Sequence, residues 1–145
     1  MIVAIDSNIL IYAHRNDLPF HEKAFHVLKH FNYNKDCPVI PWPCIYEFLT
    51  VATNYKIFKN PTTIENAIAQ IDHWMSMPQI KLIAEEGETC WLQLKTLFQS
   101  SKVTGGVIHD AKIANICSIH RVQVLWTVDR DFSRFPQLKI LNPLI

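Results

Sequence analysis

The run from Ile2 to Ile5, which ends directly at Asp6, constrains the fold of this chain more than any other stretch. Four apolar residues with almost no polar alternation indicate a short strand covered on both faces, as in the centre of a parallel sheet. Ligands of open α/β sheets gather at the carboxyl ends of the strands, so Asp6 lies where chemistry is expected. Asp6, Ser7 or Asn8 could instead only cap a following helix. This run alone leaves both interpretations open.

Length and composition describe one domain, residues 1–145, with a core of its own. No apolar run approaches the roughly 18 residues of a membrane span, and the first residues lack the basic start of a signal peptide. We therefore expect a cytoplasmic protein without membrane contact. The four cysteines lack zinc-like spacing, which predicts reduced and mostly buried thiols. A net charge of +1 means that any nucleic-acid binding must depend on a local patch.

The rest of the chain alternates between helix and strand patterns. Helices are expected at 8–15, 21–32, 43–55, 61–76, 87–100 and 107–120, and further strands at 37–41, 79–84, 123–128 and 138–141. This alternation predicts an α/β fold with a mainly parallel sheet. For the helix 61–76 we expect a start at Asn60-Pro61 and inward side chains at Ile64, Ala67, Ile68, Ile71 and Met75. For the helix 87–100 we expect Trp91, Leu94 and Phe98 in register.

Two carboxylates occupy helix positions that normally face the protein interior. Glu47 shares a helix face with Cys44 and Val51, three residues before it and four after it. Asp110 heads a stripe of apolar residues, Ile113, Ala114 and Cys117. A charge aimed at the margin of a core is costly unless it is paired or binds a metal.

Asp129 closes the strand 123–128 in the same way that Asp6 closes the first strand. Each acid has an ordinary explanation on its own: Asp110 suits a helix N-terminus, Asp129 a turn, and Glu47 a pairing lysine. Two strand ends and two helix starts can converge at one end of an α/β sheet. Four carboxylates there would repel by about 4 kcal/mol per pair at about 4 Å and an effective dielectric near 20. Mg²⁺ or Mn²⁺ removes that repulsion and suits phosphodiester hydrolysis, as in nucleases.

Other enzyme classes fit the sequence less well. The serines lack a G-x-S-x-G setting, and no cysteine has a plausible histidine partner pattern. A receiver or phosphotransfer domain usually needs an acidic pair at the first strand and a lysine at a late one. Here the first strand offers only Asp6, and 123–128 carries no lysine.

Four segments spread over nearly the whole chain carry a family resemblance: IDSNILIYA, YEF, GGVIHDAKIA and WTVDRDFSRFPQLKILNPL. With these segments the chain resembles the PIN-domain family and is most similar to VapC-type ribonuclease toxins of type II toxin–antitoxin systems. The resemblance implies a three-layer α/β/α sandwich around a mainly parallel sheet. It also implies a Mg²⁺-dependent endoribonuclease that cleaves RNA through a metal-activated water and is inhibited by a cognate antitoxin.

Site residues follow from the resemblance position by position. The catalytic and metal-binding acids (Mg²⁺ or Mn²⁺) would be Asp6, Glu47, Asp110 and Asp129, with Asn8 and Thr127 in support. Asp131 could share the metal or only cap the turn before Phe132. A PIN-like module that binds RNA or protein without cutting, and a DNA-directed nuclease, stay open as alternatives.

The aromatic content also predicts partners. A homodimer is expected because the core has difficulty absorbing Trp42, Tyr46, Trp74 and Trp91, and the resemblance also points to dimers. An antitoxin helix with an extended tail is expected across the early helices, because 9–12 and 42–55 are apolar and aromatic. Candidate RNA contacts are Arg15, Lys56, Lys102, Lys112, Arg130 and Arg134.

Overall fold

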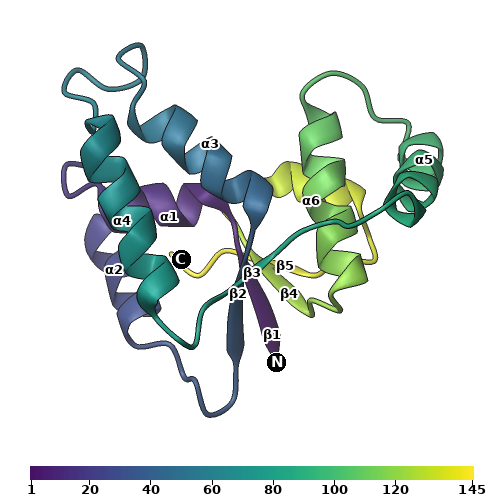
Figure 1. Ribbon diagram of the computed structural model, residues 1–145, viewed down its shortest axis with the longest axis horizontal. Coiled ribbons are helices and arrows are strands. Elements are labelled where there is room, and N and C mark those ends of the chain that lie inside the picture. The colour runs from purple at the N-terminus through teal and green to yellow at the C-terminus, as the bar shows by residue number, and fades with distance from the viewer.

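The computed structural model describes residues 1–145, apart from the side chain of Thr89. Its centre is a parallel sheet of five strands in the order β3-β2-β1-β4-β5 (Figure 1). The strands are β1 (Ile2–Ile5), β2 (Cys37–Pro41), β3 (Lys81–Ile83), β4 (Val124–Trp126) and β5 (Ile140–Leu141). β1 is central and buried, as its unbroken apolar sequence predicts.

Helices cover the two faces of this sheet and make the three-layer α/β/α sandwich. One side carries α1 (Ser7–His14), α2 (His21–Lys29), α3 (Trp42–Ala52) and α4 (Ile64–Ser76). The other side carries α5 (Thr89–Ser101) and α6 (Val107–Ile119), as Figure 1 shows. A short 3₁₀ helix, η1 (Arg130–Arg134), follows β4. No helix among the described residues combines the length and the apolar character that a membrane crossing requires.

The order of the strands determines where a site can form. β1 leads to β2 and β3 on one side, and the chain then returns to place β4 and β5 on the other side. The connections therefore change direction beside β1, and a crevice opens at such a switch point outside the carboxyl ends of the strands. Asp6 follows β1 directly, and Thr127 follows β4 directly. Both residues therefore lie at this crevice.

The ends of α4 and the face that it buries differ from the sequence prediction. The helix begins at Ile64 and not at Pro61, because the hydroxyl of Thr63 caps it by accepting a hydrogen bond from the Asn66 backbone N–H at 3.2 Å. Its buried stripe is Ala67, Ile71 and Trp74. Of the side chains predicted to point inward, Ile64, Ile68 and Met75 are instead 48%, 46% and 46% exposed.

Packing between helices explains why Trp74 is buried and Trp91 is exposed. The stripe of α4 turns toward α3 because Trp74 packs edge-on against Phe48, with ring centroids 5.0 Å apart. Trp74 is therefore part of the core, and it does not contribute to an exposed aromatic surface. Leu94 of α5 is buried as predicted, but Trp91 is 56% exposed. α5 packs against α6 and lies farther from the sheet, so it has only a narrow covered face (Figure 1).

Arg15, which the sequence offered as an RNA contact, is a structural residue. Its guanidinium is buried, pairs with Asp17 at 2.6 Å and donates to the Asn60 carbonyl at 3.0 Å. It also stacks on Phe58 at 3.8 Å from the ring centroid. The side chain thereby fixes the end of α1 to the loop between α3 and α4, and this leaves it unable to reach a ligand.

Candidate active site

Asp6 is the most constrained carboxylate of the protein. It ends β1 and caps α1, so the cap interpretation and the site interpretation both describe the same residue. Its Oδ1 accepts a hydrogen bond from the Ser7 backbone N–H at 2.7 Å and one from the Cys44 thiol at 3.5 Å. Its Oδ2 accepts from the Thr127 hydroxyl at 2.7 Å and from the Asn8 side-chain amide at 3.2 Å. These donors hold the carboxylate of Asp6 in one orientation.

Asn8 and Thr127 connect the carboxylate of Asp6 to the loop that follows β4. Asn8 donates to the Thr127 hydroxyl oxygen at 3.1 Å, and its Oδ1 accepts from the Val128 backbone N–H at 3.3 Å. The Thr127 oxygen also accepts from the Asp129 backbone N–H at 3.0 Å. The two polar residues expected beside the site therefore lie against Asp6, and they link the loop after β4 to the start of α1.

Asp129 and Asp131 begin the short helix η1. Asp129 caps it, because its Oδ1 accepts a hydrogen bond from the Asp131 backbone N–H at 2.8 Å. Of the two, Asp129 is therefore the cap, and the exposed Asp131 follows in the first turn. A turn role for Asp129 does not remove it from the site, because its charge acts on Asp6, Glu47 and Asp110.

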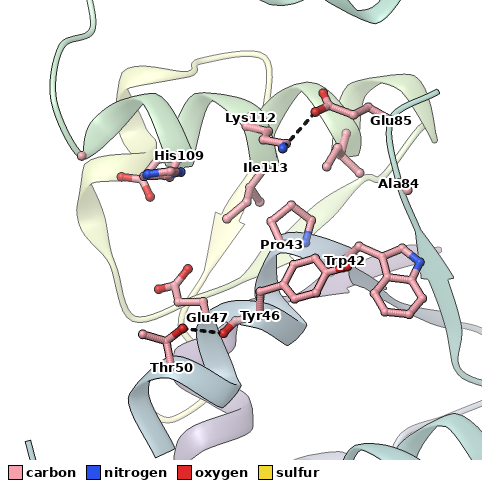
Figure 2. Close-up of a pocket in the computed structure, with 13 residues that line it drawn as sticks. Trp42, Pro43, Tyr46, Glu47, Thr50, Ala84, Glu85, His109, Lys112 and Ile113 are labelled. Carbon is pink, nitrogen blue, oxygen red and sulfur yellow. Dashed lines mark hydrogen bonds and ion pairs between the residues drawn. The ribbon is translucent and has the colours of Figure 1, made fainter. Parts of the chain in front are cut away.

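Glu47 and Asp110 approach the crevice from two different helices. Glu47 lies on α3 and Asp110 on α6, and both line one cavity of about 830 Å³. Figure 2 shows Glu47 on α3 and His109, the neighbour of Asp110, on α6, on opposite sides of this cavity. The two helix acids therefore share a solvent-filled cleft, whereas Asp6 is buried behind them.

The pKa values show that the acids act on one another. Burial is the main cause that raises the pKa of Asp6, against the hydrogen bonds that lower it. The pKa of Glu47 is raised first by the cleft wall, which desolvates the carboxyl although the side chain is exposed on its open side, and then by the charge of Asp6. Burial and then the charges of Asp129, Asp6, Glu47 and Asp131 raise the pKa of Asp110 to about 6. The structure thus brings the predicted acids into one mutually repelling cluster.

The side chains of this cluster are not arranged as the ligands of a metal ion. Among the described residues, no three His, Cys, Asp or Glu side chains already stand in an arrangement that could hold a metal. The donor types nevertheless suit a hard divalent cation, because they are carboxylate oxygens. The raised pKa values also indicate unbalanced negative charge at this place.

For several residues the sequence analysis did not predict a place at this site. The Cys44 thiol donates to Asp6, and the prediction of a buried thiol gave no indication of that role. Trp42 and Tyr46 lie on the cleft wall, as does Lys112, which pairs with Glu85 at 3.2 Å. The spacing of Tyr46 and Glu47 on one helix was visible in the sequence, but which helix faces α3 across the cleft was not.

Known proteins resemble this chain over nearly its whole length. The PIN domain family model matches residues 3–138. VapC ribonuclease Mb2897 of Mycobacterium bovis is 30% identical over 144 residues, which covers 99% of this chain and 96% of that relative. Ribonuclease VapC48 of Mycobacterium tuberculosis is 25% identical over 143 residues, which covers 99% of this chain and 98% of that protein.

Solved structures show the same fold at lower sequence identity. VapBC2 from Rickettsia felis, bound to a DNA fragment from its promoter, has a TM-score of 0.67 at 19% identity and covers 97% of this chain and 98% of that chain. Mycobacterium tuberculosis VapC20, a sarcin–ricin loop cleaving toxin, has a TM-score of 0.67 at 12% identity, over 90% and 92% of the two chains. The family match over nearly the whole chain, the full-length relatives and the fold lead to one conclusion: this chain belongs to the PIN domain family, among the VapC ribonucleases.

Proposed function

We propose that the protein is a metal-dependent endoribonuclease and the toxin of a toxin–antitoxin pair, acting in the cytoplasm as one PIN domain. The observation that carries the proposal is the group formed by Asp6, Glu47, Asp110 and Asp129, which come from four separate places in the sequence. The charges within this group help to raise the pKa values of Asp6, Glu47 and Asp110. Such a concentration of like charge destabilises the fold and is most simply explained by a cation and a phosphate that bind there.

Mg²⁺ or Mn²⁺ fits this donor set in charge and in oxygen chemistry. Asp6, Glu47, Asp110 and Asp129 would hold the ion. The exposed Asp131 would be a further ligand. When bound, the ion supplies a Lewis acid at the phosphate and a water of lowered pKa. Glu47 and Asp110 would contribute to this ion from α3 and α6, and Asp6 from the end of β1.

The residues around Asp6 contribute orientation. Thr127 and Asn8 donate hydrogen bonds to Oδ2 of Asp6, and Asn8 also holds the loop after β4. The carboxylate of Asp6 is therefore oriented before a metal binds. A preoriented carboxylate reduces the entropy that binding has to remove. This role predicts that Thr127 and Asn8 affect metal affinity without touching the substrate.

RNA is the proposed substrate because the full-length relatives are named ribonucleases. A carboxylate–metal site does not itself distinguish RNA from DNA, since it does not read the 2′-hydroxyl. The non-cleaving alternative is disfavoured because all four acids are present and interact.

The decisive experiment compares wild type, Asp110→Asn and Asp72→Asn on single-stranded RNA and DNA of equal sequence, with Mg²⁺ or EDTA. Asp72 is an exposed aspartate of α4, so its substitution makes the same chemical change outside the cleft. We expect RNA cleavage by wild type and Asp72→Asn with Mg²⁺ only, and none by Asp110→Asn. An active Asp110→Asn protein would end the assignment. Sequencing of RNA ends after brief induction in cells would then identify the target.

A cognate antitoxin is the proposed protein partner. Neighbours in fold include VapBC2 and the VapBC-1 of nontypeable Haemophilus influenzae, and the family resemblance implies an antitoxin. Of the expected contact region, 9–12 and 42–55, residues 9–11 offer little surface because they are buried in the core. The apolar groove between α2 and α4, lined by Phe25, Leu28 and Met77, is a better candidate for the antitoxin helix. An arginine of its tail would then reach the acids. Isolation of the protein alone from its native host, with the neighbouring small reading frame intact, would contradict this.

A homodimer is the proposed oligomeric state. Trp91 and Leu92 leave 56% and 58% of their surface exposed on α5, which suits an interface. Sedimentation at micromolar concentration should give twice the chain mass of 16.8 kDa. A species of 16.8 kDa alone would refute the dimer.

A further inference from the structure

The cleft continues beyond the acids along an aromatic wall. Trp42 and Tyr46 lie four residues apart on α3, so their rings share one face, with centroids 6.1 Å apart and planes tilted by 31°. Both line the cavity that Glu47 and Asp110 also line (Figure 2). We propose that Tyr46, supported by Trp42, is a base-binding subsite that stacks an unpaired nucleobase of the RNA whose phosphate lies at the acids.

The exposure of Tyr46 calls for such a ligand. Its side chain is 62% exposed, whereas Phe48 on the same helix is fully buried. An aromatic ring left open in a cleft offers a flat apolar face that a base can cover. The cavity volume of about 830 Å³ falls within the roughly 300–1,000 Å³ typical of sites that enclose a small molecule. A nucleotide therefore fits between the aromatic wall and α6.

The polar groups nearby favour stacking over hydrogen-bonded base reading. The Thr50 hydroxyl, also on this wall, donates its one proton to the Tyr46 carbonyl at 2.9 Å, so it has no proton left to donate to a base (Figure 2). On the facing wall, Lys112 pairs with Glu85 at 3.2 Å, and Lys112 is 43% exposed. An ammonium group has three donors, so Lys112 retains donors for a phosphate oxygen. Because Glu85 offsets its charge, phosphate attraction alone is weak here and the stacked base has to contribute affinity.

The geometry selects single-stranded RNA. A base in a duplex has both faces covered by its neighbours, whereas bases in loops and single strands can be splayed onto aromatic side chains. Tyr46 directly precedes Glu47, so the stacked base belongs to a nucleotide close to the scissile phosphate. The identification of the ligand as RNA depends on the proposed function, but stacking itself can be measured without any cleavage.

The test uses two fluorescein-labelled probes of ten units: oligoadenylate, and a ribose-phosphate chain of equal length and charge without bases. Binding is measured by fluorescence anisotropy, and every protein carries Asp110→Asn so that the probes remain intact. The parent should bind oligoadenylate at least about fivefold more tightly than the abasic chain, since stacking of one base on an aromatic residue contributes about 1–3 kcal/mol. Tyr46→Ala and Tyr46→Leu should lose this preference, and Tyr46→Phe should keep it.

Tyr55→Ala is the matched control, because Tyr55 is also an exposed tyrosine, at 76%, and does not line the cavity. It should retain the full preference for bases. A Tyr46→Leu protein that still prefers oligoadenylate, or a parent that binds the two probes equally, would overturn the subsite. Failure of the proposed function would look different: the protein with Asp110 intact would leave RNA uncut in Mg²⁺, whatever its binding preference.

Discussion

Asp110→Asn should stabilise the metal-free protein at neutral pH. The pKa of Asp110 is raised from 3.8 to about 6 by burial and by the neighbouring acids, so the folded state disfavours the ionised carboxylate. Between about pH 4 and 6 the folded state binds more protons than the unfolded state, and stability therefore falls as pH rises through this window. Asparagine keeps the shape of the side chain and removes the charge that causes this loss.

The magnitude follows from the shift. Roughly two pKa units correspond to about 3 kcal/mol, and solvent screening at this partly exposed group reduces that to about 1–2 kcal/mol. For a domain of this size we expect the melting temperature of Asp110→Asn to lie about 3 to 8 °C above wild type in EDTA at pH 7.5. Most of the gain should disappear at pH 4, where wild-type Asp110 is itself neutral in the folded state.

Thermal melts of wild type, Asp110→Asn and Asp72→Asn, in EDTA and in Mg²⁺ at both pH values, measure this directly. Metal at about 100 times its dissociation constant should stabilise wild type by about 2.7 kcal/mol. The same metal concentration should stabilise Asp110→Asn less, and Asp72→Asn as much as wild type. If Asp110→Asn melts below wild type in EDTA at pH 7.5, Asp110 has a structural role and the argument from repulsion is wrong.

Three further substitutions test the scaffold. Thr127→Val removes the donor at 2.7 Å from Asp6 and should cost about 1–3 kcal/mol in urea unfolding, whereas Thr127→Ser should restore stability; equal stability of the valine variant would contradict the network. Arg15→Lys should destabilise the fold because lysine lacks the planar fork and the stacking on Phe58, and its RNA affinity should stay at the wild-type value in anisotropy titrations. Phe48→Ala should cost about 3–5 kcal/mol in the same urea assay, since the ring is fully buried; a loss below 1 kcal/mol would mean that the core collapses around the gap.

The sequence predicted the sheet well because its strongest signals are local. Ile2–Ile5 is apolar throughout and is a buried strand, and β2 covers Cys37–Pro41, the range expected for it. The last three strands were predicted too long, because the sheet pairs only part of each apolar run, as in β4, which pairs only Val124–Trp126 of the expected 123–128. Pairing depends on the neighbouring strand, and a single segment does not contain that information.

The buried face of α4 could not be predicted from local sequence. Its sequence offers apolar side chains on more than one face, so periodicity could not decide between the stripe of Ile64 and Ile68 and the stripe of Ala67 and Ile71. The choice is made by Phe48 on α3, against which Trp74 packs. Contacts between helices of distant sequence position are set by tertiary structure.

The acids were foreseeable as a group because charge at the margin of a core is conspicuous in a sequence. The residues that donate hydrogen bonds to Asp6 were harder to predict. Thr127 and Asn8 were expected beside Asp6 only through the family resemblance, and the Cys44 thiol that donates to Asp6 was not expected. The sequence analysis counted Trp42 and Tyr46 toward a dimer surface. The sequence does not reveal that these two residues share a cavity with Glu47.

The hydrogen bond between Thr127 and Asp6 has a consequence for the order of folding. It joins residues that are 121 positions apart, and closing a loop of that length costs about 4 kcal/mol of chain entropy. β1 and β2 pair over a much shorter separation, with Ile2 opposite Cys37, so that half of the sheet can form early. β4 has to dock on β1 before Thr127 reaches the carboxylate. Nearly the whole chain must therefore be synthesised before Asp6 acquires its orientation, and a nascent or partly folded chain has the acids but not the site.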